Sequence, residues 1–449
     1  MDTERRPVDA MLRAASGRLR WHMPGHKGRA PFSSGDPWAL DTTELPVTDD
    51  LMSPSGAVRE AEALWAQAAG AGASLMTPGG ATAGVHTLLQ LWAAPGDTVL
   101  LPRSAHLSAV NACVLGGLRP VWIPARQTAD GFLYMAPEAI QEAVRAHPEA
   151  KALLLTRPDY YGGLIPLPVF RREGLKLVVD EAHGAHLPWM PEIPGAAELG
   201  ADGWVQSCHK TLPALTGTAV IHLRDAADAP AARRILRREQ SSSPNYLLIR
   251  SIDDARAWME AHGARRLREI VRAADALRAR LPALGYADAQ AGWKETGYAF
   301  DPTRLVIDAP QGGHRLAAQL AALGADVEMS DARRVVCILT AMDTPEDLAR
   351  LEALLRRIPP EPAERPVPPL PPLPPAVMTP REAACGRWEP VPLTEAAGRV
   401  AADPVGAYPP GIPLAMPGEL LTPELLEILK QTPPENRFGT EGELIRCVV

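Results

Sequence analysis

Short apolar runs alternate with helix-like stretches between about Thr77 and Leu223, and this alternation limits the possible folds more than any other feature of the chain. Five of the runs have the composition and length of buried strands; in order, they are DTVLLP, RPVWIP, AKALLLT, LKLVVDEAH and GTAVIHL. Strands that are separated by helical crossovers form a parallel sheet with helices packed against it. The pattern therefore predicts a large α/β domain.

The pattern of predicted helices and strands changes after this domain. Residues 224–284 are rich in Ala, Arg and Leu, and we expect them to be helical and to pack against the large domain. From Thr303 onward, strand-like runs again alternate with helical runs. This second alternation predicts a small α/β unit.

A proline-rich stretch separates the last part of the chain from the rest. Residues 359–380 contain eleven prolines, which predicts an extended linker, with a PxxP-type ligand as the alternative. The final segment is predicted to hold proline-rich turns followed by one helix. We therefore divide the chain into an N-terminal segment near the active site and dimer interface (1–75), a large domain (76–285), a small α/β domain (286–358), the linker (359–380) and a C-terminal domain (381–449).

The composition excludes several classes of protein. With 449 residues, of which 46% are hydrophobic, the chain can bury a large core. A net charge of -7 provides no basic surface for nucleic acid, and no apolar run is long enough to span a bilayer. The first residues lack the apolar core of a signal peptide, so we expect a cytoplasmic protein. Five scattered cysteines without CxxC spacing indicate neither a zinc site nor a disulfide framework.

A lysine in a polar turn between two apolar strands is the strongest local signal for chemistry. This residue, Lys210, lies in GWVQSCHKTLPALTGTAVIHL. A partly buried lysine near other cations has a lowered pKa, so its neutral amine can condense with an aldehyde. Lys210 is therefore a candidate to hold pyridoxal 5'-phosphate (PLP) as a Schiff base. The alternative is an ordinary surface lysine in a loop.

An aspartate ends another apolar strand upstream of this lysine. In LKLVVDEAHGAH, Asp180 directly follows the apolar run, and α/β sheets place ligand groups at the carboxyl ends of strands. A carboxylate there can keep the pyridine nitrogen of PLP protonated, so that the ring accepts electrons from the substrate Cα. Asp180, His183 and His186 could instead bind a metal ion, but neither an HExxH motif nor a further ligand cluster accompanies them.

A glycine-rich turn opens a helix in LMTPGGATAGVHTLLQLW. Free backbone N–H groups and the helix dipole favour an anion at such a turn, so we expect the cofactor phosphate there. The candidate residues are Gly79, Gly80, Ala81 and Thr82. The alternative is a tight turn in which Thr82 caps the helix. In the next loop, His106 could stack on a cofactor ring or have a purely structural role.

Taken together, these segments resemble the Orn/Lys/Arg decarboxylase family of fold-type I PLP enzymes, in a short form without the extra N-terminal domain of the acid-inducible members. The resemblance covers most of the chain, through WHMPGHKGR (21–29), DTTELPVTDDLMSPSGAVREAEALWAQAAGA (41–71), RSAHLSA, DEAHGAH, QSCHKTLPALTG, SSSPNYLLIRSIDDAR and YPPGIPLAMPGE (408–419). It implies an α/β fold with a mainly parallel seven-stranded sheet in a PLP-binding large domain, followed by smaller α/β domains.

The resemblance also implies roles for individual residues. Lys210 looks like the Schiff-base lysine, Asp180 like the partner of the pyridinium nitrogen, and His106 like the residue that stacks on the ring. Three further residues match positions close to the cofactor and substrate: His183 beside the phenolic oxygen, and Ser207 and His209 near the phosphate and the substrate.

The sequence departs from the family pattern at two places. Residues 78–81 read Pro-Gly-Gly-Ala where the family usually has Asn-Gly-Thr-Ser, so two hydroxyl donors are missing. Backbone N–H groups, Thr82 and Ser207 would then hold the phosphate. Residues 106–108 read His-Leu-Ser where the family has His-Lys-Ser.

These observations predict a PLP-dependent decarboxylase that converts lysine, arginine or ornithine to the corresponding diamine or polyamine. His209 or Lys210 would return a proton to Cα. The candidates to bind the cationic side chain of the substrate are Asp403, Glu419, Asp49 and Asp50. The alternatives are an aminotransferase or a lyase that eliminates at Cβ, and a PLP-fold protein without turnover.

The resemblance also predicts a homodimer or a larger homo-oligomer. In such a dimer, residues 23–29 (MPGHKGR) and 241–246 (SSSPNY) would approach the site from the partner subunit or line its entrance. These segments are polar and lie far from Lys210 in sequence. We therefore expect the active site to be completed by the neighbouring chain.

Overall fold

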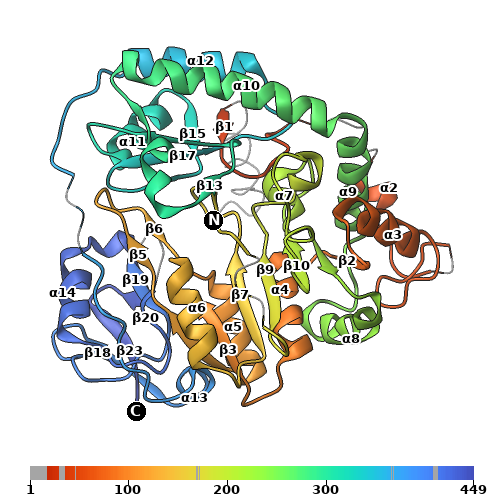
Figure 1. The fold of residues 1–449 in the computed structure, drawn as a ribbon, viewed down its shortest axis with the longest axis horizontal. Helices are drawn as coiled ribbons and strands as arrows, with labels where there is room; N and C mark the ends of the chain where they lie inside the picture. Colours follow the sequence, from red (N-terminus) through yellow and green to blue (C-terminus); the bar gives the residue numbers. More distant parts are fainter. Residues whose placement is uncertain are drawn as a thin grey trace, which may run out of the picture.

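The largest element of the fold is a seven-stranded sheet with the order β2-β11-β10-β9-β7-β3-β4 (Figure 1). The computed structural model describes residues 18–29, 36–45, 47–167, 170, 172–365, 367, 369–407 and 413–449. The strands are β2 (Ala73–Thr77), β3 (Thr98–Pro102), β4 (Arg119–Ile123), β7 (Ala152–Thr156), β9 (Lys176–Asp180), β10 (Gly203–Gln206) and β11 (Ala219–Leu223). All five apolar runs predicted to be strands belong to this sheet.

One strand of the sheet runs against the predicted direction. Strand β11 is antiparallel to both of its neighbours, β10 and β2, whereas the pairs from β10 to β4 are all parallel. The chain passes from β10 to β11 through the short helix α7 (Cys208–Thr211) and a turn, which leaves no crossover that could restore the parallel direction. The other six strands all end at the same edge of the sheet, and the chain segments that follow them meet there.

Helices cover both faces of this sheet, because alternate residues of each buried strand point to opposite sides. On one face, α4 (Gly80–Trp92), α5 (Leu107–Gly116) and α8 (Ala229–Glu239) pack on Val99, Leu101, Leu154, Val178 and Val205. On the other face, Leu100, Leu153, Val179, Trp204 and Val220 meet α3 (Ala57–Ala69), α6 (Pro137–Ala146) and α9 (Tyr246–Trp258). The site-bearing edge is therefore part of a three-layer core.

A long helical arm leads from this domain to the small domain (Figure 1). Helix α9 continues through a π-helical turn (Met259–Gly263) into α10 (Ala264–Arg280), so the prediction of a helical segment here agrees with the structure. The small domain has an antiparallel sheet of order β12-β14-β17-β16. Its elements are β12 (Ala287–Asp288), β14 (Arg304–Asp308), α11 (Gly313–Ala322), β16 (Met329–Ser330), β17 (Arg334–Ile338) and α12 (Pro345–Arg357).

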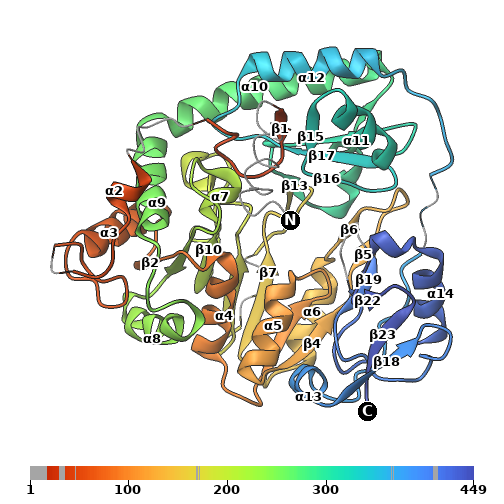
Figure 2. The same ribbon diagram turned by 180° about the vertical axis from the view of Figure 1, so that it is seen from behind.

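The N-terminal segment is joined to the small domain. Strand β1 (Leu19–Trp21) pairs in parallel with β15 (Ala325–Val327), and Trp21 is completely buried in the small-domain core. This pairing is visible from behind in Figure 2, where β1 lies beside β15. The sequence alone gave no sign of it, because the two strands are short and far apart along the chain.

The proline-rich linker runs along the small domain to a compact C-terminal domain. In the linker, Ala363 N–H donates to Pro310 O at 3.0 Å, and Arg365 forms an ion pair with Asp308. In the described residues of the C-terminal domain there are two α-helices and two three-stranded sheets, so the prediction of turns and one helix was incomplete. Its elements are α13 (Pro380–Cys385), β18 (Trp388–Pro392), β19 (Val405–Ala407), β20 (Pro413–Ala415), α14 (Pro423–Gln431), β21 (Arg437–Phe438), β22 (Thr440–Glu441) and β23 (Leu444–Val448).

Prolines explain why these strands were not predicted. Strand β18 contains two prolines and β20 begins with one, and proline is a poor strand former that is tolerated at sheet edges. Within the described part of the chain, no helix combines the length and the apolar character that crossing a membrane requires.

Candidate active site

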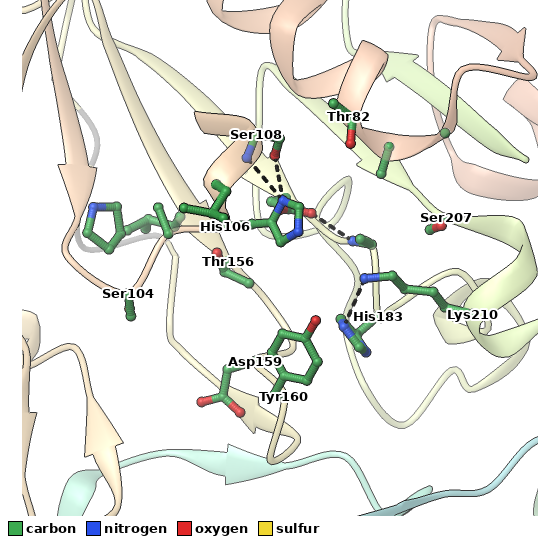
Figure 3. Close-up of a pocket in the computed structure, with 18 of the residues that line it drawn as sticks. Thr82, Ser104, His106, Ser108, Thr156, Asp159, Tyr160, His183, Ser207 and Lys210 are labelled. Carbon is green, nitrogen blue, oxygen red and sulfur yellow. Dashed lines mark hydrogen bonds between the residues drawn. The ribbon is translucent and has the colours of Figure 1, made fainter. Parts of the chain in front are cut away.

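A pocket of about 750 Å³ lies at the edge of the large sheet where the strands end (Figure 3). Ligands bind at the carboxyl ends of strands in open α/β sheets, so this is the expected location. The pocket brings together all of the site residues predicted from the sequence. They are Gly79, Gly80, Ala81, Thr82, His106, Asp180, His183, Ser207, His209 and Lys210.

Lys210 lies in α7, directly after β10, and its side chain reaches into the pocket. Its Nζ is 3.1 Å from His183 Nε2 and 5.7 Å from the centre of the Tyr160 ring (Figure 3). Burial lowers the pKa of Lys210, and Arg304 acts in the same direction, although Asp180 and Glu328 oppose them. The site therefore favours the neutral amine that condensation with an aldehyde requires.

Asp180 is the last residue of β9 and is buried. Its Oδ1 accepts a hydrogen bond from Ala182 N–H at 3.1 Å, which fixes the carboxylate at the wall of the pocket. The metal alternative considered for this motif is not supported by the way its histidines are used. His183 Nε2 contacts Lys210, whereas His186 Nε2 lies 3.2 Å from Asp301 Oδ2, so the two rings serve different partners.

The glycine-rich turn forms the N-terminus of helix α4, whose N-cap is Gly79. Thr82 is not the cap, and no side chain caps this end. In the described part of the chain, the backbone N–H groups of Gly80, Ala81 and Thr82 have no hydrogen-bond acceptor. Gly80 has a φ of 67°, which glycine adopts without strain. This open end of a 13-residue helix can bind a phosphate through the three N–H groups and the helix dipole.

His106 caps helix α5 and faces the pocket. Its Nδ1 accepts a hydrogen bond from Ser108 N–H at 3.1 Å, so a neutral ring carries its proton at Nε2. The surrounding protein removes enough water to lower the pKa of His106, and Lys210 adds to this effect while Asp180 opposes it. A neutral ring held in this way presents an apolar face to the pocket.

Ser207 is the N-cap of α7, and His209 lies in α7 directly before Lys210. The Nδ1 of His209 is 3.1 Å from Thr218 O and 3.2 Å from Ser207 Oγ. Burial lowers the pKa of His209, and Lys210 acts in the same direction. The neutral ring therefore donates from Nδ1 to the carbonyl oxygen and keeps a lone pair at Nε2.

Several pocket residues were missed from the sequence. Asp159 and Tyr160 lie just after the end of β7, and Asp180 lies at the end of β9, so the strand-end rule could have identified them. Tyr298, Met329 and Phe438 also line the pocket. They come from the segment before β14, the small domain and the C-terminal domain, and no local pattern marks them.

The acidic residues proposed to bind the substrate side chain lie elsewhere. Glu419 forms a buried ion pair with Arg103, with N–O distances of 2.7 and 2.8 Å. Asp49 accepts hydrogen bonds from the N–H groups of Gly56 and Val58 at the start of α3. Asp50 accepts from Met52 N–H, and Asp403 pairs with Arg446 at 3.5 Å. None of these four carboxylates lines the pocket at the sheet edge.

Residues 23–29 contact the site of their own chain. Gly25 N–H donates to His209 O at 2.7 Å, and a Cβ at Gly25 would lie 2.6 Å from Leu212 O. Arg29 pairs with Asp347 in the small domain at 2.7 Å. The segment therefore supports α7 from within the same subunit, and a role toward the site of a neighbouring chain stays a prediction. Of the motif YPPGIP, residues 408–412 lie outside the described residues.

Solved structures of other proteins have folds similar to that of this chain. The lysine decarboxylase of Francisella novicida has a TM-score of 0.78 at 19% identity, over 89% of this chain and 73% of that chain. An alanine–glyoxylate aminotransferase from Nostoc sp. has a TM-score of 0.57 at 16% identity, over 76% of this chain and 94% of that chain. These likenesses confirm the predicted fold-type I architecture, with a mostly parallel seven-stranded sheet followed by C-terminal domains.

Comparison with protein families and curated relatives identifies the family. The model for the Orn/Lys/Arg decarboxylase major domain matches residues 11–311, and the model for the C-terminal domain matches residues 370–432. The arginine decarboxylase of Bacillus subtilis (strain 168) is 31% identical over 434 residues, which cover 90% of this chain and 89% of the relative. The constitutive lysine decarboxylase of Escherichia coli (strain K12) is 26% identical over 54% of this chain and 39% of its own length. The chain therefore belongs to the Orn/Lys/Arg decarboxylase family and is an amino-acid decarboxylase, a lyase.

Proposed function

We propose that this enzyme binds PLP through Lys210 and decarboxylates a basic L-amino acid, namely lysine, arginine or ornithine, to the corresponding amine. The observation that carries the proposal is the convergence of a buried lysine with a lowered pKa, a strand-end aspartate and an open helix N-terminus around one pocket. Each of these three groups matches one part of PLP, namely its aldehyde, its pyridine nitrogen and its phosphate. The names of the relatives support the substrate class.

Different residues of the pocket would bind different parts of the cofactor. The N–H groups at the start of α4, together with Thr82 and Ser207, would hold the phosphate. Asp180 would keep the pyridine nitrogen protonated, and His106 would stack on the ring. When bound, PLP supplies an electron sink for the bond that breaks between Cα and the carboxylate. Phe438 and Tyr298 line the pocket, and their rings would exclude water from the reacting atoms.

Lys210 is the better candidate to return a proton to Cα. Neutral His209 donates from Nδ1 to Thr218 O, so only a lone pair remains at Nε2. Lys210 has a pKa lowered by burial toward the working pH, so its Nζ can both hold and release a proton. Among the described residues that line the pocket, the carboxylates are Asp159 and Asp180. Asp159 is therefore the group left to pair with the cationic side chain of the substrate.

The residues that line the pocket also distinguish decarboxylation from transamination. An aminotransferase would need an arginine to hold the substrate α-carboxylate, and no arginine is among the described residues that line this pocket. This favours decarboxylation over transamination.

We also propose that the protein works as a homodimer in the cytoplasm. Residues 36–45 and Val47 include exposed apolar side chains, among them Trp38 at 87% and Val47 at 89% exposure. A second copy that covers them would remove this apolar surface from water. Sedimentation equilibrium of the wild-type protein tests the dimer directly.

Carbon dioxide and amine release from lysine, arginine and ornithine tests the catalytic proposal, with Lys210→Ala as the control. We expect the wild-type protein to show the visible absorbance of bound PLP and to release both products without a keto acid. Lys210→Ala should lose the absorbance and the turnover together, because no other lysine lines the described pocket. A requirement for a keto acid would indicate an aminotransferase. Absorbance without any amine product would indicate a binding protein.

A further inference from the structure

A buried arginine from the small domain contacts the histidine that touches Lys210. Arg304 is completely buried, and its Nη2 lies 3.3 Å from His183 Nδ1 and donates to His183 O at 3.0 Å. On the other side of the same ring, His183 Nε2 is 3.1 Å from Lys210 Nζ. One imidazole therefore connects β14 of the small domain with the lysine on α7.

The partners of the ring determine where its proton lies. A guanidinium has hydrogen-bond donors only, so His183 Nδ1 must accept from Arg304. Burial, with Lys210 and Arg304 nearby, holds the pKa of His183 well below its usual value, so the ring is neutral. The single ring proton is then at Nε2, and it points at Lys210 Nζ. An amine can accept this hydrogen bond only when it carries a lone pair, that is, when it is neutral.

The opposite tautomer would be unfavourable. A proton at Nδ1 would face the guanidinium N–H at 3.3 Å, which sets two donors against each other inside the protein. Leaving a buried donor without an acceptor is costly enough to favour one tautomer about 5-fold or more.

Arg304 is itself fixed by a buried set of polar groups. Its Nη1 donates to Thr303 Oγ1 at 3.1 Å and lies 3.5 Å from Asp301 Oδ2. His186 Nε2 lies 3.2 Å from the same carboxylate oxygen. Although burial acts in the other direction, His186 and Arg304 hold the pKa of Asp301 below its usual range. Asp301 therefore remains charged and balances the guanidinium.

We propose that Arg304 is a positioning residue that fixes the Nε2–H tautomer of His183, so that His183 donates to the neutral amine of Lys210 and holds it ready to react. This rests on the proposed role of Lys210 in binding PLP. The small domain thereby controls the protonation state and direction of a lysine in the large domain. His183 is the connection between them, and it releases Lys210 Nζ whenever the amine forms a covalent bond.

The ring and the amine have other charged and titratable neighbours, and the test must take them into account. Those that act on Lys210 or His183 are Asp180, Glu328, Arg304, His106, His186 and the ring of Tyr160. Removing Arg304 takes away a positive charge as well as a hydrogen bond, and both changes favour protonated Lys210. The tautomer of His183 depends on the hydrogen bond from Arg304, whereas the pKa of Lys210 depends on both the hydrogen bond and the charge. The tautomer is therefore the primary measurement.

The experiment uses the full-length protein, labelled with ¹⁵N-histidine and freed of cofactor, and compares wild type with Arg304→Met. The His183 signals are assigned by their loss in His183→Gln. We expect protonated Nε2 and unprotonated Nδ1 in wild type, and a shift toward protonated Nδ1 in Arg304→Met. The matched control is Arg334→Met, which removes another buried guanidinium of the same small-domain sheet, one that pairs with Asp331 and Asp130. We expect the control to keep the wild-type tautomer.

A second measurement follows the capture of added PLP by visible absorbance as a function of pH. Because capture needs the neutral amine, the midpoint of the rate profile should rise by about one pH unit in Arg304→Met, which is a roughly tenfold slower rate below the midpoint. Arg334→Met should keep the wild-type midpoint.

Protonated Nδ1 in the wild-type protein would overturn the inference even if no variant folds. An unchanged tautomer and midpoint in folded Arg304→Met would overturn it as well. Failure of wild type to capture PLP at all would instead contradict the proposed function, since the tautomer is measured without cofactor.

Discussion

At the scale of single residues, two acids that are adjacent in the chain point to different places at the end of β9. Asp180 and Glu181 are adjacent, and both are buried. Asp180 lies opposite Val205 of β10 and faces the pocket. Glu181 points into the protein, where Ala196 N–H and Gln206 Nε2 donate to its two oxygens at 2.9 and 2.8 Å. The two adjacent acids therefore have different surroundings. We expect Asp180 to affect activity and Glu181 to affect the pH dependence of stability.

For Asp180, we predict that Asp180→Asn binds PLP but loses most of its activity, by at least about 100-fold. The neutral amide has nearly the same shape but cannot keep the pyridine nitrogen protonated, so the ring becomes a poorer electron sink. Visible absorbance measures PLP binding, and CO2 release measures turnover. Near-normal turnover in Asp180→Asn would show that the carboxylate has another role.

For Glu181, we predict a contribution to the pH dependence of stability. Burial raises the pKa of Glu181 from 4.5 to about 7, although Gln206 and Arg157 oppose this. Between these two values the native protein binds a proton that the unfolded chain has released, so stability falls as pH rises through this window. The pKa difference corresponds to a loss of up to about 3 kcal/mol between pH 4.5 and pH 7.

Urea unfolding of wild type and Glu181→Gln at pH 5 and pH 8 measures this contribution. Glutamine does not titrate, so the stability difference between the two proteins should move in favour of the variant as pH rises. Other buried acids, such as Asp159, whose pKa burial raises to about 6, act equally in both proteins and cancel in the comparison. Parallel pH profiles would mean that Glu181 titrates with an ordinary pKa.

At the scale of elements, the position of the phosphate-binding helix depends on its contact with the sheet. A Cβ at Gly84 of α4 would lie 2.4 Å from Val205 Cγ2 and 3.2 Å from Ile221 Cγ1. Glycine at this position therefore lets the helix approach β10 and β11 closely. The same contact sets where the free N–H groups at the start of α4 lie relative to Lys210.

We predict that Gly84→Ala destabilises the protein by about 1 to 3 kcal/mol and weakens PLP binding, because the helix must move away from the sheet. The matched control is Gly292→Ala, since a Cβ at Gly292 meets nothing within 4 Å. Urea midpoints and PLP titrations measure the two effects. Adding Val205→Ala to Gly84→Ala should restore part of both, and a lack of rescue would place the cause elsewhere.

At the scale of the whole molecule, we predict that the N-terminal segment acts on the site of its own subunit. Gly25→Val should disable the enzyme, because Gly25 lies against Leu212 O and bonds to His209 O. When inactive Gly25→Val is mixed with inactive Lys210→Ala and the subunits exchange, each site still carries one defect. Activity should then stay at the level of the separate variants. Recovery after verified exchange of differently tagged subunits would show that this segment serves the partner.

The sequence was informative wherever a local rule applies. Lys210, Asp180 and the turn before α4 each lie at or just after the end of a strand, and strand ends of an α/β sheet form the binding edge whatever the rest of the chain does. Phe438 and Arg304 reach the site region through packing between domains, which no local pattern encodes. The mainly parallel sheet was predicted correctly, but which strand is antiparallel was not predicted, because it depends on the short connection between β10 and β11 rather than on the strand itself.

The pairing of β1 with β15 has a consequence for how the chain is made. Leu19 of β1 pairs with Ala325, about 300 residues later in the sequence. At a synthesis rate of about 5 to 20 residues per second, β15 leaves the ribosome about 15 to 60 s after β1. During this time Trp21, which is fully buried in the finished protein, has no strand beside it and no core to enter. The first strand in the described part of the chain is thus among the last to be placed, and we expect the beginning of the nascent chain to need protection until the small domain has emerged.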